Sequence, residues 1–328
     1  MKAMMIEEYG GPEVLLRREV EIPAPGPGEV LVEMAFAGIN FMDVHTRQGK
    51  YRNSRTYPVR LPLTLGMEGA GTVTRVGSGV GRVEVGDRVA WCISWGSYAD
   101  FAVVPEARLA RVPDGIPLDL AAATVFQGAT AHYLTHDVGR LGPGTTCLVH
   151  AASGGIGQLL VQFARRLGAR VLATTSSEAK ATVARELGAD VVVGYDDFAE
   201  AIRAATHGAG VDVVFDAVGR TTLRESFRAT RTKGLVVNYG SVAGSLSDLD
   251  PIELGEAGSL FLTRPRLADH LADPETVQRR ADDVFAGLLD GSLSMQINGR
   301  FGFEEIEEAH AALEERRQIG KSVLDLQA

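Results

Sequence analysis

The hydrophobic pattern of this chain of 328 residues changes character near its middle. The first third contains short apolar runs that are rich in β-branched residues and are separated by glycine and proline. The clearest runs are "GEVLVEMAFAGIN", "GTVTRVGSGV", "GDRVAW" and "SYADFAVVPEARLARVPDG". Several short strands with closely spaced turn signals predict a small β-barrel or sandwich.

From residue 146 onward, the pattern predicts strands that alternate with helices. Predicted strands cover 146–151, 169–175, 189–195, 210–219 and 234–240, with helices at 157–168, 178–188 and 198–208. The near-repeat "ARRLGARV" and "ARELGADV", twenty residues apart, indicates one helix-to-strand joint used twice. The strands are continuous runs of Val and Leu, as expected when both faces of a sheet are covered. The pattern therefore predicts an α/β protein with a doubly wound parallel sheet.

The chain is longer than one hydrophobic core usually supports, which favours two domains. A predicted helix at 117–135 leads from the β-rich part into the alternating part. The last 65 residues contain amphipathic helices at 273–291 and 303–320 and a closing strand at 321–326. We predict a β-rich domain of residues 1–122 and 264–328, and an α/β domain of residues 123–263.

Composition and charge narrow the function classes. The net charge of -9 is spread along the chain, which disfavours nucleic acid and anionic membranes as partners. The start of the chain has no signal-peptide pattern, and no window approaches the ~18 apolar residues of a membrane span. We therefore expect a cytoplasmic protein. Cys92 and Cys147 are too few for a disulfide framework or a four-cysteine zinc lobe.

The segment "HAASGGIGQ" lies between the first strand of the predicted sheet and its helix. Read as Ala152-x-Gly154-x-x-Gly157, it is a dinucleotide-binding fingerprint whose first glycine is replaced by alanine. The later glycines let the backbone approach a pyrophosphate, which then faces the N-terminus of the helix. A plain glycine-rich turn is the alternative, but the strand, turn, helix and second strand together favour cofactor binding.

The end of the second strand, "LATTSSEAK", bears on which dinucleotide binds. An NAD site would favour Asp or Glu there, to hold the ribose 2′-hydroxyl. This chain has Thr175, followed by Ser176, Ser177 and Lys180, which supply hydrogen-bond donors for a 2′-phosphate. The sequence therefore favours NADPH. The alternative is that Lys180 is an ordinary solvated helix lysine.

Short-chain dehydrogenases have a similar fingerprint but use a Tyr-x-x-x-Lys pair, and no tyrosine here is followed by lysine four residues later. Instead, the domain order resembles the medium-chain dehydrogenase/reductase superfamily over essentially the whole chain. Its zinc alcohol dehydrogenases carry Gly-x-Cys-x-x-Asp and Gly-His-Glu, where this chain has "GINFMD" and "GMEG". Asn40 and Met67 stand where the cysteine and histidine would be, and an amide with a thioether is a poor zinc site. We expect a zinc-free member.

Within the superfamily, the chain is similar to the zinc-free quinone oxidoreductases of the zeta-crystallin-like branch. The similarity lies in "GINFMDVHTRQGKY", "GMEGAGTV", "HAASGGIGQ", "TSSEAK", "NYG" and "GKSVLDL". It implies a GroES-like β-barrel catalytic domain, a Rossmann domain that binds NADPH, and a homodimer formed through the edge strand "SLFLTRP". The helix that often reads Lys-Gly-x-Thr in the family reads "QGAT" here, so Gln127 cannot supply that charge.

The same resemblance implies a set of site residues. Asn40 and Asp43 would lie near the nicotinamide, together with Thr130 and Ser241. Lys321 and Ser322 fall where the family returns to the cofactor cleft. The remaining cofactor-binding residues would be Ala152, Gly154, Gly155, Ile156 and Gly157 at the pyrophosphate, and Thr175, Ser176, Lys180 and Tyr195 around the adenosine.

Tyr51 separates two hypotheses for the acceptor. The segment "RQGKY" is similar to "QGNY" of enoyl thioester reductases, in which that tyrosine donates a proton. An enolate needs such a donor, whereas a quinone can take protons from water. We predict an NADPH-dependent quinone oxidoreductase with Asn40, Asp43 and Tyr51 at the acceptor. The alternatives are an enoyl thioester or enone reductase, for which Arg47, Lys50, Arg52 and Arg55 could be contacts, and a non-catalytic, crystallin-like NADPH-binding protein.

Overall fold

The computed structural model describes residues 1–316 and 318–328, and it divides into two compact units. Unit 1 comprises Met1–Ala129 and Leu271–Ala328, and unit 2 comprises Thr130–His270. Both divisions fall later than the predicted boundaries at 122 and 263. Helix α2 (Leu118–Tyr133) explains the first difference, because the division falls within this helix and not at its start.

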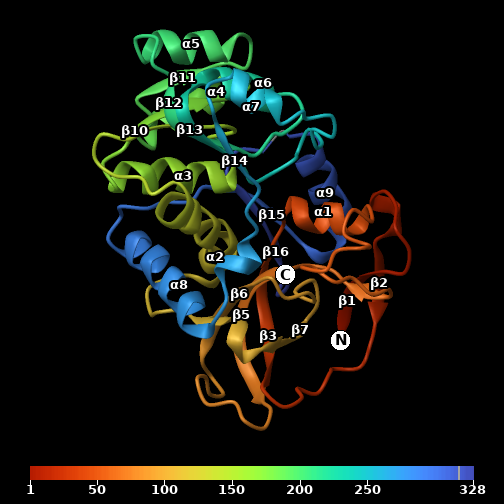
Figure 1. Cartoon of the computed structure of the whole chain (residues 1–328). Coiled ribbons are helices and arrows are strands. Elements are labelled where there is room, and N and C mark those ends of the chain that lie inside the picture. The colour runs from red at the N-terminus through yellow and green to blue at the C-terminus, as the bar shows by residue number, and fades with distance from the viewer. Residues whose placement is uncertain (317) are drawn as a thin grey trace. The chain divides into compact units, whose positions relative to one another are not determined.

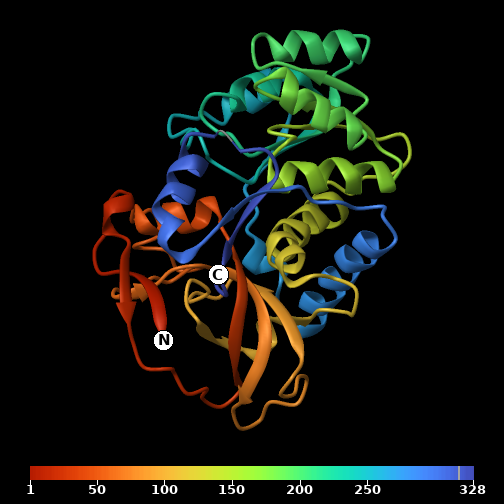
Figure 2. The same cartoon turned by 180° about the vertical axis from the view of Figure 1, so that it is seen from behind.

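Unit 1 is built on two sheets. The smaller has the order β2-β1-β4, and the larger has seven strands in the order β15-β16-β3-β5-β6-β8, with β7 paired to β3. Figure 2 shows β3, β5 and β6 side by side. The strands are β1 (Lys2–Ile6), β2 (Leu16–Glu19), β3 (Glu29–Gly38), β4 (Leu63–Thr64), β5 (Glu68–Val76), β6 (Arg88–Cys92), β7 (Phe101–Pro105), β8 (Leu109–Arg111), β15 (Ile297–Phe301) and β16 (Lys321–Asp325).

The core of this barrel-like unit is formed by alternate residues of its strands. Val30, Val32 and Met34 of β3 pack with Val89 and Trp91 of β6, and all five are buried. Because strand side chains alternate between the two faces, this spacing aims every second residue at the core. The β-rich domain predicted from the sequence is confirmed.

Of the α-helices among the described residues, α1 (Phe41–Arg47), α8 (Pro274–Leu289) and α9 (Ile306–Glu314) belong wholly to unit 1. Helix α9 is shorter than the predicted helix at 303–320, whose residue 317 lies outside the described residues. The acidic residues around the start of α9 are exposed: Glu304, Glu305, Glu307 and Glu308.

Unit 2 contains the predicted parallel sheet, with the strand order β11-β10-β9-β12-β13-β14. Helix α3 packs on β9 and β10, α4 and α5 on β11, and α6 on β12 and β13 (Figure 1). The elements are β9 (Thr146–Val149), α3 (Gly155–Arg166), β10 (Arg170–Thr174), α4 (Glu178–Glu186), β11 (Val191–Val193), α5 (Phe198–Ala205), β12 (Val211–Asp216), α6 (Leu223–Ala229), β13 (Thr230–Asn238), α7 (Ile252–Glu256) and β14 (Phe261–Thr263).

The repeated joint predicted from the sequence is present in unit 2. Gly168 follows α3 with φ +79°, and Gly188 follows α4 with φ +104°. Glycine adopts this left-handed conformation without steric cost, and it ends each helix so that the next strand begins at once. The predicted α/β fold class, with a parallel sheet beside a β-rich domain, is therefore confirmed. In the part of the chain that the structure describes, no helix combines the length and the apolar character needed to cross a membrane.

Candidate functional site

The glycine-rich loop of unit 2 connects β9 to α3. Gly154 precedes the helix in an extended conformation, and the first N–H groups of α3 have no acceptor within the helix. A Cβ atom on Gly157 would lie 2.2 Å from the carbonyl oxygen of Ala151 and 2.8 Å from the Cα of Ala152. The loop therefore packs against the first turn of α3 only because residue 157 has no side chain. The N–H groups at the start of α3 suit an anionic pyrophosphate.

A cavity of about 430 Å³ lies at the ends of β10 and β11 in the same unit. The predicted residues Thr175, Ser176 and Tyr195 line it. Arg185 and Glu178 also line it and form an ion pair of 2.6 Å, which the sequence analysis did not single out. The remaining lining residues are Ser177, Ala181, Val192, Val193, Gly194 and Asp196.

Lys180 extends alongside this cavity. Its Nζ donates a hydrogen bond of 3.2 Å to Ser176 Oγ, and partial burial lowers the pKa of the ammonium. Its backbone N–H donates to Ser177 Oγ, which caps α4. The hydroxyls and the ammonium predicted to hold a 2′-phosphate therefore lie together at one helix N-terminus.

Tyr195 links the cavity to the glycine-rich loop. The backbone N–H of Ala151 donates a 3.0 Å hydrogen bond to the Tyr195 hydroxyl. Ala151 has φ +51°, a left-handed conformation that is unusual for a residue with a side chain. The Tyr195 ring also stacks on His150 at an interplanar angle of 15°.

A buried polar network lies beneath this loop. Asp216, at the end of β12, accepts hydrogen bonds from Thr222 Oγ1 and Ser226 Oγ as well as from two backbone N–H groups. Ser226 Oγ lies 3.0 Å from His150 Nε2, and Thr174 Oγ1 lies 2.8 Å from His150 Nδ1. Burial lowers the pKa of His150, which favours the neutral ring. His150 is thus held by hydrogen bonds on both ring nitrogens and has a structural role.

Two further predicted residues carry buried hydroxyls. Thr130 Oγ1 and Ser322 Oγ have no hydrogen-bond partner among the described residues. A buried hydroxyl without a partner is costly unless a ligand or water completes it. Ser241 lies in the loop after β13. The glycine-rich loop and the cavity, both in unit 2, are a donor set that fits a phosphorylated dinucleotide.

Unit 1 contains a buried charged cluster that the sequence analysis only partly identified. Lys321 Nζ lies 2.9 Å from Glu68 Oε2, 2.6 Å from Asn40 Oδ1 and 2.9 Å from the carbonyl oxygen of Ile39. Lys321 is 4% exposed and Glu68 is fully buried. The Glu68 carboxylate also accepts from the backbone N–H of Phe126 (2.7 Å) and from Asn40 Nδ2 (2.9 Å).

The Gln127 side chain completes this cluster. Its amide lies 2.8 Å from Asn40 Oδ1, 2.6 Å from Lys321 Nζ and 3.0 Å from Glu68 Oε1, so all three polar groups of the cluster contact it. Burial lowers the pKa of Lys321, whereas Glu68 and Asp43 oppose this shift. Glu68 could have been found from the sequence as the one carboxylate in "GMEG". Its ion pair with Lys321 could not, because the two residues are far apart in the chain.

Asp43 and Tyr98 form a second buried group beside this cluster. Asp43 Oδ2 accepts from the backbone N–H of Asn40 (2.9 Å) and from the Tyr98 hydroxyl (3.0 Å). Burial raises the pKa of Asp43 to about 7, although these donors and Lys321 act against it. The Tyr98 hydroxyl is also 3.5 Å from His310 Nε2, and burial lowers the pKa of His310 to about 3.

The residues at the position of the zinc site do not fit that metal. Asn40 and Met67 offer an amide and a thioether, both poor ligands for zinc. The carboxamide oxygen of Asn40 is held by the ammonium of Lys321, which also neutralises Glu68. A divalent cation beside that ammonium would meet like charge.

Tyr51 lies among aromatic rings of unit 1. Its ring centroid is 5.7 Å from that of Tyr57 in an edge-to-face arrangement, and 6.3 Å from that of His45. The prediction that Arg47 could bind an acceptor at the surface is wrong, because its side chain is fully buried and pairs with Glu314 of α9. Arg52 and Arg55 are exposed.

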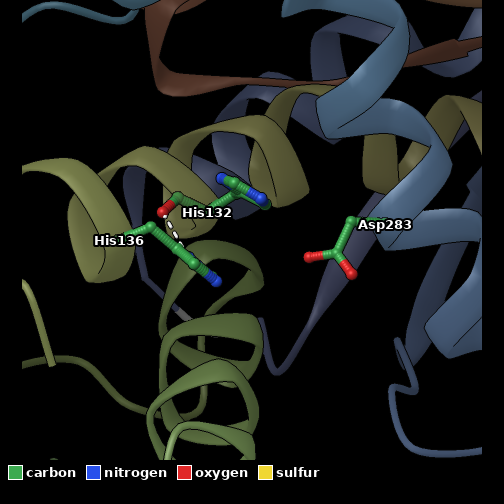
Figure 3. A group of neighbouring side chains, drawn as sticks. All are labelled: His132, His136 and Asp283. Atoms are coloured by element: carbon green, nitrogen blue, oxygen red, sulfur yellow. Dashed lines mark hydrogen bonds between the residues drawn. The ribbon is translucent and has the colours of Figure 1, made fainter. Parts of the chain in front are cut away.

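His132 and His136 lie one turn apart in unit 2, with nearly parallel rings whose centroids are 4.0 Å apart (Figure 3). His136 Nδ1 lies 2.9 Å from the carbonyl oxygen of His132, and α2 passes there into the π-helix Leu134–Val138. Asp283, also drawn, belongs to α8 of unit 1. Two histidines are fewer than the three protein ligands of a typical zinc site, so we assign no metal to them.

Two family models match this chain, one in each part of the predicted fold. Residues 26–114 match a family model described as an alcohol dehydrogenase GroES-like domain, and residues 155–265 match one described as a zinc-binding dehydrogenase. The chain is 38% identical to a quinone oxidoreductase of Pseudomonas aeruginosa, over 98% of this chain and 99% of that one. It is 36% identical to a 2-haloacrylate reductase from Burkholderia, over 99% of both chains.

Among solved structures, the chain is similar to Escherichia coli quinone oxidoreductase complexed with NADPH. The TM-score is 0.95 at 32% identity, and the match covers 99% of this chain and 100% of the other. The parallel sheet with its glycine-rich loop, beside a GroES-like domain, defines a dinucleotide-dependent type of dehydrogenase. The chain belongs to the medium-chain dehydrogenase/reductase superfamily, in its quinone oxidoreductase branch.

Proposed function

We propose that this protein is a zinc-free, NADPH-dependent reductase that transfers a hydride to a quinone or a related conjugated acceptor. The observation that carries the cofactor assignment is the cavity at the end of β10. It has neutral Thr175 where an NAD site would carry a carboxylate, with Ser176, Lys180 and Tyr195 around it. The NADPH complex of the E. coli relative supports the same cofactor.

The proposal gives each predicted residue a role. Bound NADPH supplies the hydride. The loop residues Ala152, Gly154, Gly155, Ile156 and Gly157 bind the pyrophosphate through their backbone. Ser176 and Lys180 bind the 2′-phosphate, and Tyr195 lies beside them and holds the pyrophosphate loop through Ala151. The unpartnered hydroxyls of Thr130 and Ser322, with Ser241, complete the nicotinamide side. Asn40, Asp43 and Tyr51 orient the acceptor and exclude water.

The acceptor is proposed to be already electrophilic. Without a zinc ion to polarise a ketone, the substrate itself must stabilise the charge that the hydride brings. Quinones meet this requirement, and several relatives are quinone oxidoreductases.

The Burkholderia relative, a 2-haloacrylate reductase, favours a second candidate function: reduction of an activated carbon–carbon double bond. In that case Tyr51 is the proton donor to the enolate.

The experiment is NADPH oxidation followed by absorbance, with a small para-quinone, crotonyl-CoA and 2-chloroacrylate as separate acceptors, for the wild type and Tyr51→Phe. Fast quinone turnover that survives the substitution supports the quinone proposal. Fast turnover of crotonyl-CoA or 2-chloroacrylate that collapses with Tyr51→Phe supports the double-bond reductase instead. No turnover with any acceptor, despite NADPH binding, supports the non-catalytic crystallin-like alternative.

A further inference from the structure

The buried cluster of Lys321, Glu68, Asn40 and Gln127 contains one positive and one negative charge in the interior of unit 1. Removing either charge alone would leave the other buried without compensation. Burial of such a pair is not required for a stable core, because apolar residues of similar volume often stabilise as well. The retained charges therefore call for a role beyond packing.

The pair fixes the direction of the Asn40 carboxamide. Lys321 Nζ donates to Asn40 Oδ1 at 2.6 Å, while Asn40 Nδ2 donates to Glu68 Oε2 at 2.9 Å and to the carbonyl oxygen of Gly38 at 3.2 Å. A cation on one side and an anion on the other permit only one orientation of the amide. Because residue 40 is also the residue before α1, the same contacts hold the start of that helix.

We propose that Lys321 is a positioning residue of the acceptor site: its buried ammonium, delivered from β16, neutralises Glu68 and locks the Asn40 carboxamide in its working orientation. This inference rests on the proposed function, because the proposed function is what has Asn40 orient the acceptor. The ammonium of Lys321 is then a fixed cation next to Asn40, which stands where zinc-dependent relatives carry a metal ligand.

A cation could also reach the Glu68 carboxylate from helix α2. The Gln127 side chain of α2 lies 2.6 Å from Lys321 Nζ and 3.0 Å from Glu68 Oε1. A lysine at residue 127 would therefore bring its ammonium to the same carboxylate.

The test compares the wild type with two double variants and one control. In Glu68→Gln/Lys321→Gln both charges are removed, so no uncompensated charge remains. In Gln127→Lys/Lys321→Gln the ammonium and the amide exchange elements. Lys2→Gln, at an exposed lysine, is the matched control. For each we would measure thermal unfolding, kcat and KM for quinone, and KM for NADPH.

We expect the neutral pair to fold, to lose at least tenfold in kcat and to keep its KM for NADPH within twofold of the wild type. The exchange variant should recover kcat to within threefold, and Lys2→Gln should be unchanged. A folded neutral pair with wild-type kcat would overturn the proposal, and so would an exchange variant that is unfolded or no more active than the neutral pair. An inactive wild type would instead refute the proposed function. In that case the melting temperature of the exchange variant still shows whether a lysine at residue 127 can replace Lys321 as the partner of Glu68.

Discussion

Asp43 carries a carboxyl group with no exposed surface, three residues after the asparagine that is proposed to contact the acceptor. Burial raises its pKa from 3.8 to about 7. Between these two values the folded protein holds a proton that the unfolded chain has already lost. The free energy of unfolding therefore falls as the pH rises through this window, by on the order of 4 kcal/mol from this group.

We predict that Asp43→Asn removes this pH-dependent contribution. The neutral amide oxygen can still accept from Asn40 N–H or the Tyr98 hydroxyl, but it cannot acquire a charge. Urea unfolding between pH 4 and 7.5 would show the wild type losing stability relative to Asp43→Asn as the pH rises. Asp114→Asn, at an exposed carboxyl, is the control and should follow the wild type. A constant difference between wild type and Asp43→Asn across this range would contradict the prediction.

Gly157 gives a second prediction at the residue scale. A methyl group there meets backbone atoms of Ala151 and Ala152, which cannot move without opening the loop. Gly157→Ala should weaken NADPH binding at least tenfold, or by about 1.4 kcal/mol. A fluorescence titration with NADPH measures this. Gly142→Ala, where the added methyl group meets no atom within 4 Å, should bind NADPH as the wild type does. Equal affinities for the two variants would show that the loop does not hold the cofactor.

At the scale of elements, the sequence predicted the strands and helices whose positions are set by patterns of neighbouring residues. The strands of unit 2 and their glycine-terminated helices were predicted because continuous apolar runs and left-handed glycines leave local signals. Helix α1 was missed because its seven residues are too few to show an apolar period. The contacts of the Lys321 cluster were not predicted because its members are remote: Lys321 and Asn40 are 281 residues apart, and the pairing of β16 with β3 helps to bring them together.

Tyr195 supports a prediction about the joint between β9 and α3. Its hydroxyl accepts from Ala151 N–H, so Tyr195→Phe would release a left-handed residue of the pyrophosphate loop. Because the pyrophosphate is common to both cofactors, KM should rise severalfold for NADPH and for NADH alike. Ser176→Ala, which removes only a proposed 2′-phosphate donor, should raise KM for NADPH alone. If Tyr195→Phe affects NADPH and spares NADH, the tyrosine acts on the 2′-phosphate and not on the loop.

At the scale of the whole molecule, β14 forms one edge of the six-stranded sheet, and among the described residues no further strand pairs with it. Its first residue, Phe261, is 64% exposed. An exposed apolar edge strand is an aggregation hazard unless another chain covers it. We therefore expect two copies of the chain to pair through β14, as the family resemblance also implies.

This expectation can be tested at one residue. Phe261→Glu would give the edge strand of each copy a negative charge, and it should raise the dimer dissociation constant at least tenfold, which corresponds to about 1.4 kcal/mol. Light scattering on a dilution series measures the mass directly. Ile252→Glu is the matched control, since Ile252 is apolar, 65% exposed and part of α7 in the same unit. A dimer that survives Phe261→Glu but dissociates with Ile252→Glu would place the interface on α7, and a wild type that is monomeric at every concentration would rule out pairing through β14.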